Sequence, residues 1–285
     1  MTVVELREPA SLVELRPSDD DYPSGLSDLA RPPDPLWVEG DLAALRRHPR
    51  VAIVGTRRLT GYGERVAREL ATAVARAGAI VVSGLAQGID SAAHAGAIDA
   101  DMPTIAVLGE GIASFHATVV RRRARLAARC VLVSPYPPGA AALPWRFASR
   151  NAIIAALAAV VVVVEAPHDS GALITAFDAR RLRRPLYAVP GPLGSAASVG
   201  TNALIADGLA LALTGAEMLL GALGLRAEAE EPTATSRLAD ALAAGPLAPD
   251  ALGRALGLGP IEVATLIASD PSVVTLADGR IARRH

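Results

Sequence analysis

The chain has 285 residues, of which 51% are hydrophobic, and a formal net charge of −1 at pH 7. This length allows one large domain and one small domain with a sizeable core. One cysteine excludes disulfides within the chain. No signal peptide or uninterrupted membrane-spanning stretch is recognisable, so we expect a cytoplasmic protein without a membrane partner.

Charge is distributed unevenly along the chain. Residues 1–50 contain six arginines and ten acidic residues, a net charge of −4. Residues 117–190 contain eleven arginines and three acidic residues, a net charge of +8. The basic half favours an anionic partner on one surface, although solvated helix faces would also explain many of these arginines.

The apolar pattern predicts an α/β domain over residues 50–223. Before it, residues 1–49 predict an irregular lead-in that packs on this domain, with a short strand at 36–40 and a short helix at 41–48. Apolar, β-branched runs then alternate with helical patterns, which gives a doubly wound, mainly parallel sheet buried on both faces. The strands are expected near 51–54, 79–83, 104–108, 130–134, 160–165 and 185–189.

The loops that follow these strands meet at one edge of the sheet, where glycine lets backbone N–H groups and helix N-termini approach an anion. The first loop carries Gly55, Arg57 and Arg58. Its glycine spacing is neither the dinucleotide fingerprint nor a Walker loop. We therefore favour phosphate binding by the arginines over a loop that only makes a tight turn.

The second loop runs from Ser83 to Asp90, with Gly84 and Gly88 bracketing a turn that also contains Gln87. Asp90 stands where a helix N-cap is expected, so we predict a cap first and a ligand contact second. His94, one turn later, is more typical of a packed histidine than of a base.

The segment 144–151 places two aromatic side chains, Trp145 and Phe147, beside Arg146 and Arg150, followed by Asn151. Cations for the backbone and flat rings for the bases are what single-stranded nucleic acid requires. The alternative is that both rings belong to a helix core. We slightly favour a surface position for Phe147, and for Trp145 the sequence favours neither position.

A further anion site is predicted where Ser170 and Gly171 open a helix that continues through Thr175. A plain capping serine is an equally good interpretation. No catalytic motif and no Cys/His metal spacing is recognisable, so we expect neither enzymatic activity nor a cofactor.

The C-terminal part has a different composition. Residues 224–235 are charged and small and predict a linker. Residues 236–285 predict a small winged-helix-like domain, with helices at 236–244, 248–256 and 260–268 and a hairpin turn at Asp278-Gly279. The third helix has Glu262 and no arginine, so reading of duplex DNA looks weak there and a protein contact is as plausible.

Together these motifs resemble the DNA-processing protein A family, also called DprA or Smf. The resemblance covers about residues 20–220 and rests on the segments 54–57, 83–90, 147–154, 170–176, 188–191 and 198–205. It implies an extended Rossmann fold that binds single-stranded DNA as a homodimer. Members load the RecA recombinase onto such strands, including those coated by single-strand-binding protein, in recombination and natural transformation.

Carried over by position, Arg57 and the turn from Gly84 to Gly88 would hold backbone phosphate, and Phe147 would stack on a base. Arg146 would stand near a basic residue of the family. The pocket would be shaped and closed by Arg150, Asn151, Ser170, Gly171 and Thr175.

The chain departs from the family pattern at Ala152, where an arginine is usual, and at Pro135, where a glutamate is usual. Two other functions stay open at this point. One is a nucleotide-processing enzyme of the phosphoribohydrolase type, which the missing second glycine after Pro190-Gly191 counts against. The other is a winged-helix DNA-binding regulator.

Overall fold

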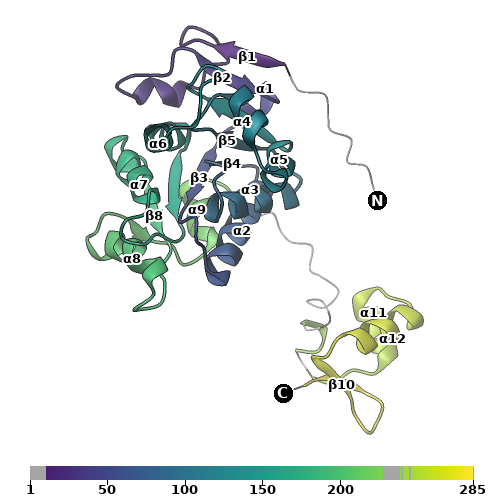
Figure 1. Ribbon diagram of the computed structural model, residues 1–285. Helices are drawn as coiled ribbons and strands as arrows, with labels where there is room; N and C mark the ends of the chain where they lie inside the picture. Colours follow the sequence, from purple (N-terminus) through teal and green to yellow (C-terminus); the bar gives the residue numbers. More distant parts are fainter. Residues whose placement is uncertain (1–10, 227–237, 239, 244, 285) are drawn as a thin grey trace. The chain divides into compact units, whose positions relative to one another are not determined.

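The computed structural model describes residues 11–226, 238, 240–243 and 245–284, without the side chain of Arg122. Contacts divide the chain into two compact units, Met1–Ala227 and Glu228–His285. In the larger unit a sheet lies between two layers of helices (Figure 1).

Within the described residues, nine strands form one sheet in the order β1-β2-β6-β5-β4-β3-β7-β8-β9. The strands from β6 to β9 are parallel, whereas β1 and β2 pair antiparallel at one edge. This arrangement confirms the predicted doubly wound, mainly parallel sheet. The bounds are β1 Leu12–Leu15, β2 Leu36–Glu39, β3 Arg50–Val54, β4 Ile80–Ser83, β5 Thr104–Val107, β6 Cys130–Ser134, β7 Val160–Val163, β8 Leu186–Ala188 and β9 Leu211–Ala212.

Helices follow most of the parallel strands and return the chain from the carboxyl ends to the amino ends of the strands. They are α1 Leu42–Arg46, α2 Gly61–Arg76, α3 Ile89–Asp99, α4 Ile112–Thr118, α5 Arg121–Ala127, α6 Pro144–Leu157, α7 Ala172–Arg181, α8 Val199–Ala206 and α9 Ala216–Ala222. Two 3-10 turns, Ser24–Asp28 and Ala196–Ser198, complete the unit.

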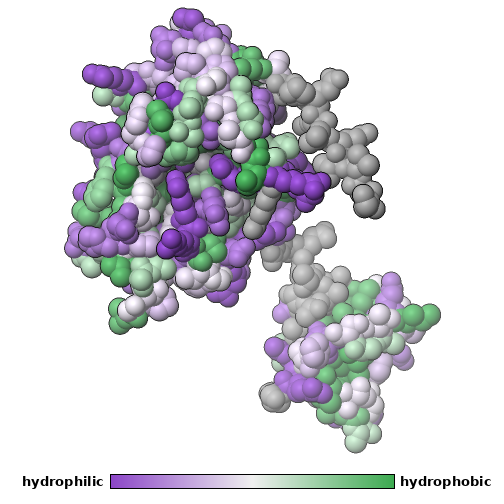
Figure 2. Space-filling view, in the orientation of Figure 1, coloured by the Kyte–Doolittle hydropathy of each residue, from purple (hydrophilic) through white to green (hydrophobic). Residues whose placement is uncertain are grey.

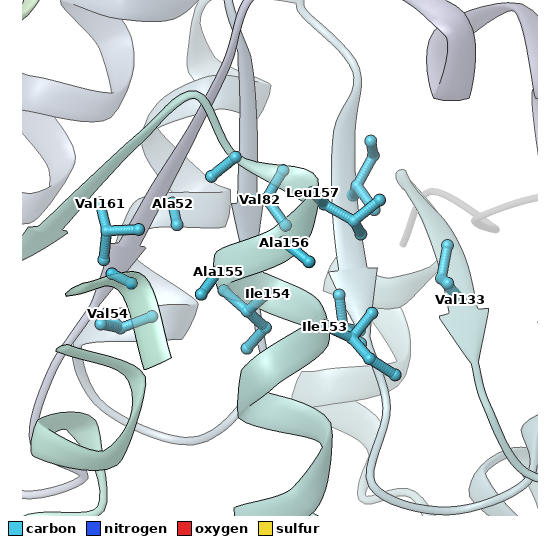
Figure 3. Close-up of a cluster of buried hydrophobic side chains, with 14 of the residues drawn as sticks. Ala52, Val54, Val82, Val133, Ile153, Ile154, Ala155, Ala156, Leu157 and Val161 are labelled. Atoms are coloured by element: carbon cyan, nitrogen blue, oxygen red, sulfur yellow. The ribbon is translucent and has the colours of Figure 1, made fainter. Parts of the chain in front are cut away.

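Both faces of the sheet are buried because successive side chains of a strand point to opposite sides. On β3, Ala52 and Val54 belong to the core shared with α6 and α7, whereas Val51 and Ile53 belong to the core shared with α2 and α3. Figure 3 shows residues 153–157 of α6 lying against β3, β4, β6 and β7. The packing holds the start of α6 beside the carboxyl ends of these strands.

The chain order reverses at β3. From β3 it proceeds outward through β4 and β5 to β6, and it then returns to place β7 on the other side of β3. Loops on either side of such a reversal diverge, which leaves a crevice outside the carboxyl ends of the two strands. The topology therefore directs attention to the loops after β3 and β7.

Two short strands were not expected. β1 lies in the segment predicted to be irregular, and β9 follows α8. β1 is an edge strand of four residues paired only with β2, and only Leu15 in it is buried. A strand this short, with one buried residue, shows no recognisable alternation of apolar and polar residues. The prediction of an irregular segment was therefore wrong at β1.

The second unit contains α11 Pro249–Leu256, α12 Pro260–Ser269, and a hairpin of β10 Val273–Thr275 with β11 Ile281–Arg283. α11 and α12 meet at 99°, within the range of helix-turn-helix pairs. Figure 2 shows hydrophobic residues across the visible face of this unit, and Ile261 on α12 is 83% exposed. Of the helix expected at 236–244, residues 236, 237, 239 and 244 lie outside the described residues, and the winged-helix interpretation stays a prediction.

Among the described residues, no single helix is long and apolar enough to cross a membrane, and only α11 and α12 taken together pass that test of length and composition. No group of three or more His, Cys, Asp or Glu side chains in the described ranges could hold a metal ion.

Candidate functional site

A cleft of about 670 Å³ opens at the crevice that the sheet topology creates. Its walls come from the loop after β3, the first half of α6, and the loop that joins β7 to α7. Ten of the fifteen predicted site residues line it: Gly55, Arg57, Arg58, Asp90, Phe147, Arg150, Asn151, Ser170, Gly171 and Thr175.

The mouth of the cleft carries a cation beside an aromatic ring. Arg57 is exposed, and its guanidinium carbon lies 5.7 Å from the centroid of the Phe147 ring. The ring also packs on Gly109, where a Cβ atom would lie 2.6 Å from Phe147 Cδ1. Phe147 is thus half-buried and fixed in place rather than part of the core. The pair offers fixed positive charge and a flat surface at one point.

Arg58 stands next to Arg57 and is also exposed. Its backbone N–H donates to the hydroxyl of Thr56 at 3.1 Å, which shapes the turn directly after β3. Neither arginine forms an ion pair with an acidic side chain of the described residues. Both guanidinium groups are therefore available to an anionic ligand.

The second loop is closed by a carboxylate of the chain itself. Asp90 Oδ2 accepts hydrogen bonds from the backbone N–H groups of Gly84 at 3.2 Å and Ala86 at 3.4 Å. The expected N-cap role is wrong, because Gly88 caps α3 and the Asp90 side chain turns back into the loop. Asp90 already occupies the Gly84 N–H donor, and the role of the turn from Gly84 to Gly88 in holding phosphate stays a prediction.

Arg150 lines the cleft but is only 4% exposed. Its Nη1 donates to the carbonyl oxygen of Val107, and a Cβ atom at Gly84 would overlap its guanidinium. Burial lowers the pKa of Arg150 to about 10, and the charge of Asp90 opposes that shift. Burial likewise raises the pKa of Asp90, against the effect of Arg150. Arg150 is therefore a structural cation in the lining of the cleft.

The first loop has its own internal anion as well. Glu165 is buried, and its carboxylate accepts hydrogen bonds from the Thr60 backbone N–H at 3.0 Å and the Thr60 hydroxyl at 2.5 Å. Thr60 caps α2, so this carboxylate sits where a Rossmann fold usually receives a phosphate. The helix N-terminus of the first loop is thus filled, and the arginines remain as its ligand-facing groups.

The opposite wall comes from the start of α7. Ser170 Oγ accepts the backbone N–H of Ala172 at 3.3 Å, although the N-cap of α7 is Gly171 and not the serine. Asn151 of α6 donates to the Gly171 carbonyl oxygen at 3.1 Å and ties the two helices together. Gly171 is exposed, and Thr175 is buried behind it. This wall offers a hydroxyl and a helix N-terminus to the cleft.

Five predicted residues do not line the cleft: Ser83, Gly84, Gln87, Gly88 and Arg146. Ser83 is buried and donates to the Ile53 carbonyl oxygen at 2.6 Å. Gly88 has φ +93°, and a Cβ atom there would overlap the carbonyl oxygen of Thr56. Gln87 is exposed on the second loop. Ser83 and Gly88 thus shape the loops.

His94 is buried, as predicted for a packed histidine. Thr104 donates its hydroxyl proton to the Val81 carbonyl oxygen at 2.8 Å, so the contact at 2.8 Å between Thr104 and His94 Nδ1 requires a proton on Nδ1. Burial, with a smaller effect of Arg150, lowers the pKa of His94 to about 3. The neutral ring has no access to a ligand.

Arg123 was missed by the sequence reasoning. Its Nε donates to the Leu85 carbonyl oxygen at 3.0 Å, and its guanidinium carbon lies 5.3 Å from the Phe115 ring centroid. Burial lowers the pKa of Arg123; Glu110 opposes this, and Arg57 adds to it. The arginine run at 121–125 was the only signal, and it did not show which member turns towards the second loop.

Residues 14–224 match the family model described as DNA recombination-mediator protein A. The chain belongs to that family. It is 42% identical over 213 residues to the putative DNA processing protein DprA of Mycobacterium tuberculosis, covering 69% of this chain and 54% of that protein. It is 40% identical to the protein Smf of Escherichia coli, covering 72% of this chain and 55% of that protein. The chain thus spans about half the length of these relatives.

Solved structures of the DprA family share this fold. The DprA of Streptococcus pneumoniae superposes with a TM-score of 0.68 and 34% identity over 74% of each chain. The DprA of Helicobacter pylori superposes with a TM-score of 0.67 and 27% identity, covering 75% of this chain and 96% of that chain. The latter structure is described by its single-stranded DNA binding mode.

Proposed function

We propose that the cleft at the β3–β7 crevice binds single-stranded DNA. The observation that carries this proposal is the Arg57–Phe147 pair at the mouth of the cleft, with Arg58 beside it. Guanidinium groups contact the phosphates and the ring stacks on a base, which is how proteins hold unpaired strands with little sequence preference. The binding described for the relative from Helicobacter pylori supports this assignment.

We further propose that the protein acts as a recombination mediator, not as an enzyme. It would load RecA onto the bound strand, including strands coated by single-strand-binding protein, and would work as a homodimer. Membership of the DNA recombination-mediator protein A family supports this role. The carboxylates of Asp90 and Glu165 disfavour the nucleotide-processing alternative, because they occupy the loop N–H groups that would receive a mononucleotide phosphate.

Fluorescence anisotropy with labelled oligo-dT and a matched duplex, across a salt series, tests the binding. We expect preference for the single strand and affinity that falls as salt rises, because neutralised phosphates release counterions. Phe147→Ala should weaken binding by about 1–3 kcal/mol. Arg57→Ala should weaken it too and lower the salt slope by about one.

The matched control is Arg180→Ala, which removes the same charge from an exposed arginine in the last turn of α7. That turn lies towards the amino ends of the parallel strands, away from the cleft, because α7 runs back from the carboxyl end of β7. The proposal fails if Arg57→Ala and Phe147→Ala bind oligo-dT as tightly as the Arg180→Ala control. Release of free base from nucleoside monophosphates would instead favour the enzyme.

Loading is tested by the rate at which RecA forms filaments on oligonucleotides coated with single-strand-binding protein. Added protein should shorten the lag of RecA ATP hydrolysis, and Arg57→Ala should not. An unchanged lag in the presence of protein that binds oligo-dT would separate strand binding from RecA loading.

A further inference from the structure

Trp145 is a large aromatic side chain at the start of α6 that is not part of the cleft. Trp145 is 59% exposed. Pro144 and Phe147, which lie in the same helical turn, both line the cleft. Because Trp145 follows Pro144 directly, their Cα atoms lie about 3.8 Å apart. Trp145 therefore stands in the chain between two lining residues without lining the cleft itself.

The indole is held in place by its neighbours. Its ring meets Tyr136 edge to face, with centroids 6.2 Å apart and planes at 88°. The guanidinium carbon of Arg146 lies 5.3 Å from the Trp145 centroid and 4.8 Å from the Tyr136 centroid. Arg146 is fixed in turn, because its Nη1 donates to the Ala141 carbonyl oxygen at 2.7 Å. The ring is thus oriented before any ligand binds, which lowers the entropic cost of binding.

The surroundings of Trp145 suit a nucleic acid better than a protein partner. An indole with a guanidinium beside it matches a base and the phosphate attached to it. Residues 136–151 contain Arg146 and Arg150 and no acidic residue, so nothing in this segment repels phosphate. A duplex hides the faces of its bases, and only an unpaired strand can place one on the ring.

We infer that Trp145, set edge-on to Tyr136 and flanked by Arg146, is a second base-stacking position that extends the strand path beyond the cleft. The inference rests on the proposed function and deepens it. A strand that stacks one base on Phe147 inside the cleft passes Pro144 and stacks another base on Trp145. Arg146, which does not line the cleft, then holds the phosphate between the two positions.

Tryptophan fluorescence tests this directly, because the chain contains two tryptophans, Trp37 and Trp145. Trp37 lies in β2, packed beside the cluster of Phe115 and Leu132. Trp37→Phe leaves Trp145 as the only indole. Titration of this variant with unlabelled oligo-dT should quench its emission, with the same midpoint as the anisotropy curve. Trp145→Phe, which retains only Trp37, should show no quenching.

Affinity gives the second readout. Trp145→Ala should weaken binding of a long oligo-dT between about fivefold and a hundredfold, as expected for the loss of one stacked base. Trp145→Phe keeps a ring and should retain most of the affinity. An oligonucleotide too short to leave the cleft should bind the parent and Trp145→Ala equally, whereas Phe147→Ala should weaken both lengths.

The outcomes separate this inference from the proposed function. If Trp37→Phe binds oligo-dT without quenching, or Trp145→Ala binds the long strand as the parent does, the inference is wrong and strand binding at the cleft stands. If Trp145→Ala changes the sedimenting mass while strand affinity per protomer is kept, the indole belongs to a protein contact and the inference is wrong. If no variant and no parent binds oligo-dT, both proposals fail.

Discussion

Arg150 provides the sharpest test of how the site is built, because it lines the cleft and yet is only 4% exposed. Arg150→Met keeps the length and apolar volume of the side chain and removes its charge. The Val107 carbonyl loses a charged donor, and the buried carboxylate of Asp90 loses the cation that opposes its burial. Leaving a buried charge without the opposite charge that compensates it costs about 3–5 kcal/mol.

Urea unfolding followed by tryptophan emission is a suitable assay, since Trp37 and Trp145 both lie in the larger unit and report on it alone. We expect Arg150→Met to lower the free energy of unfolding by about 3–5 kcal/mol. The matched control is Arg58→Met, an exposed arginine of the same cleft, which should stay within about 0.5 kcal/mol of the parent and weaken DNA binding instead.

A double-mutant cycle with Asp90→Asn isolates the coupling between the two charges. The double variant should lose less stability than the sum of the single variants, because neither charge is then left uncompensated. If Arg150→Met is as stable as Arg58→Met, Arg150 is not the structural cation described above. If the losses simply add, Asp90 and Arg150 act independently and the electrostatic argument is wrong.

Three further predictions use the same unfolding assay. Gly84→Ala forces a Cβ atom into the Arg150 guanidinium and should destabilise the larger unit. The control is Gly61→Ala, which has open space around it at the start of α2 and should leave stability unchanged or raise it by up to about 1 kcal/mol. Equal stabilities of the two variants would contradict the packing of Gly84 on Arg150. Glu165→Gln should cost about 1–3 kcal/mol, because the α2 N-terminus loses its anion and one Thr60 donor loses its acceptor; a variant as stable as the parent would refute this. Folding holds the pKa of His94 at about 3, whereas the unfolded chain takes up a proton on this residue near pH 6.5. The free energy of unfolding therefore falls as pH falls, and His94 alone should lower it by about 2 kcal/mol between pH 7 and pH 5. His94→Gln should lose that part of the pH dependence, and identical pH profiles would show that His94 does not cause it.

Much of the cleft was predictable because most of its residues lie in short motifs directly after the strands. The central strands β3, β4 and β5 are each followed within two residues by a glycine (Gly55, Gly84 and Gly109), and parallel strands bring these loops to one edge. Arg57 and Phe147 were each singled out from their own motif, but only the structure shows that the two side chains lie together. What local pattern could not reveal was β1, since an edge strand with one buried residue has no recognisable period.

The sequence by itself determined the order of strands and loops, the doubly wound sheet, and the arginines that face the cleft. The tertiary structure decided which loop donors remain for a ligand. Asp90 takes the N–H of Gly84, and Glu165 takes that of Thr60 from 105 residues away. In the second loop this carboxylate is local, whereas in the first loop it comes from the end of another strand, which a local pattern does not show. Arg150 lines the cleft as predicted, but packing leaves it only 4% exposed, so that its charge is structural.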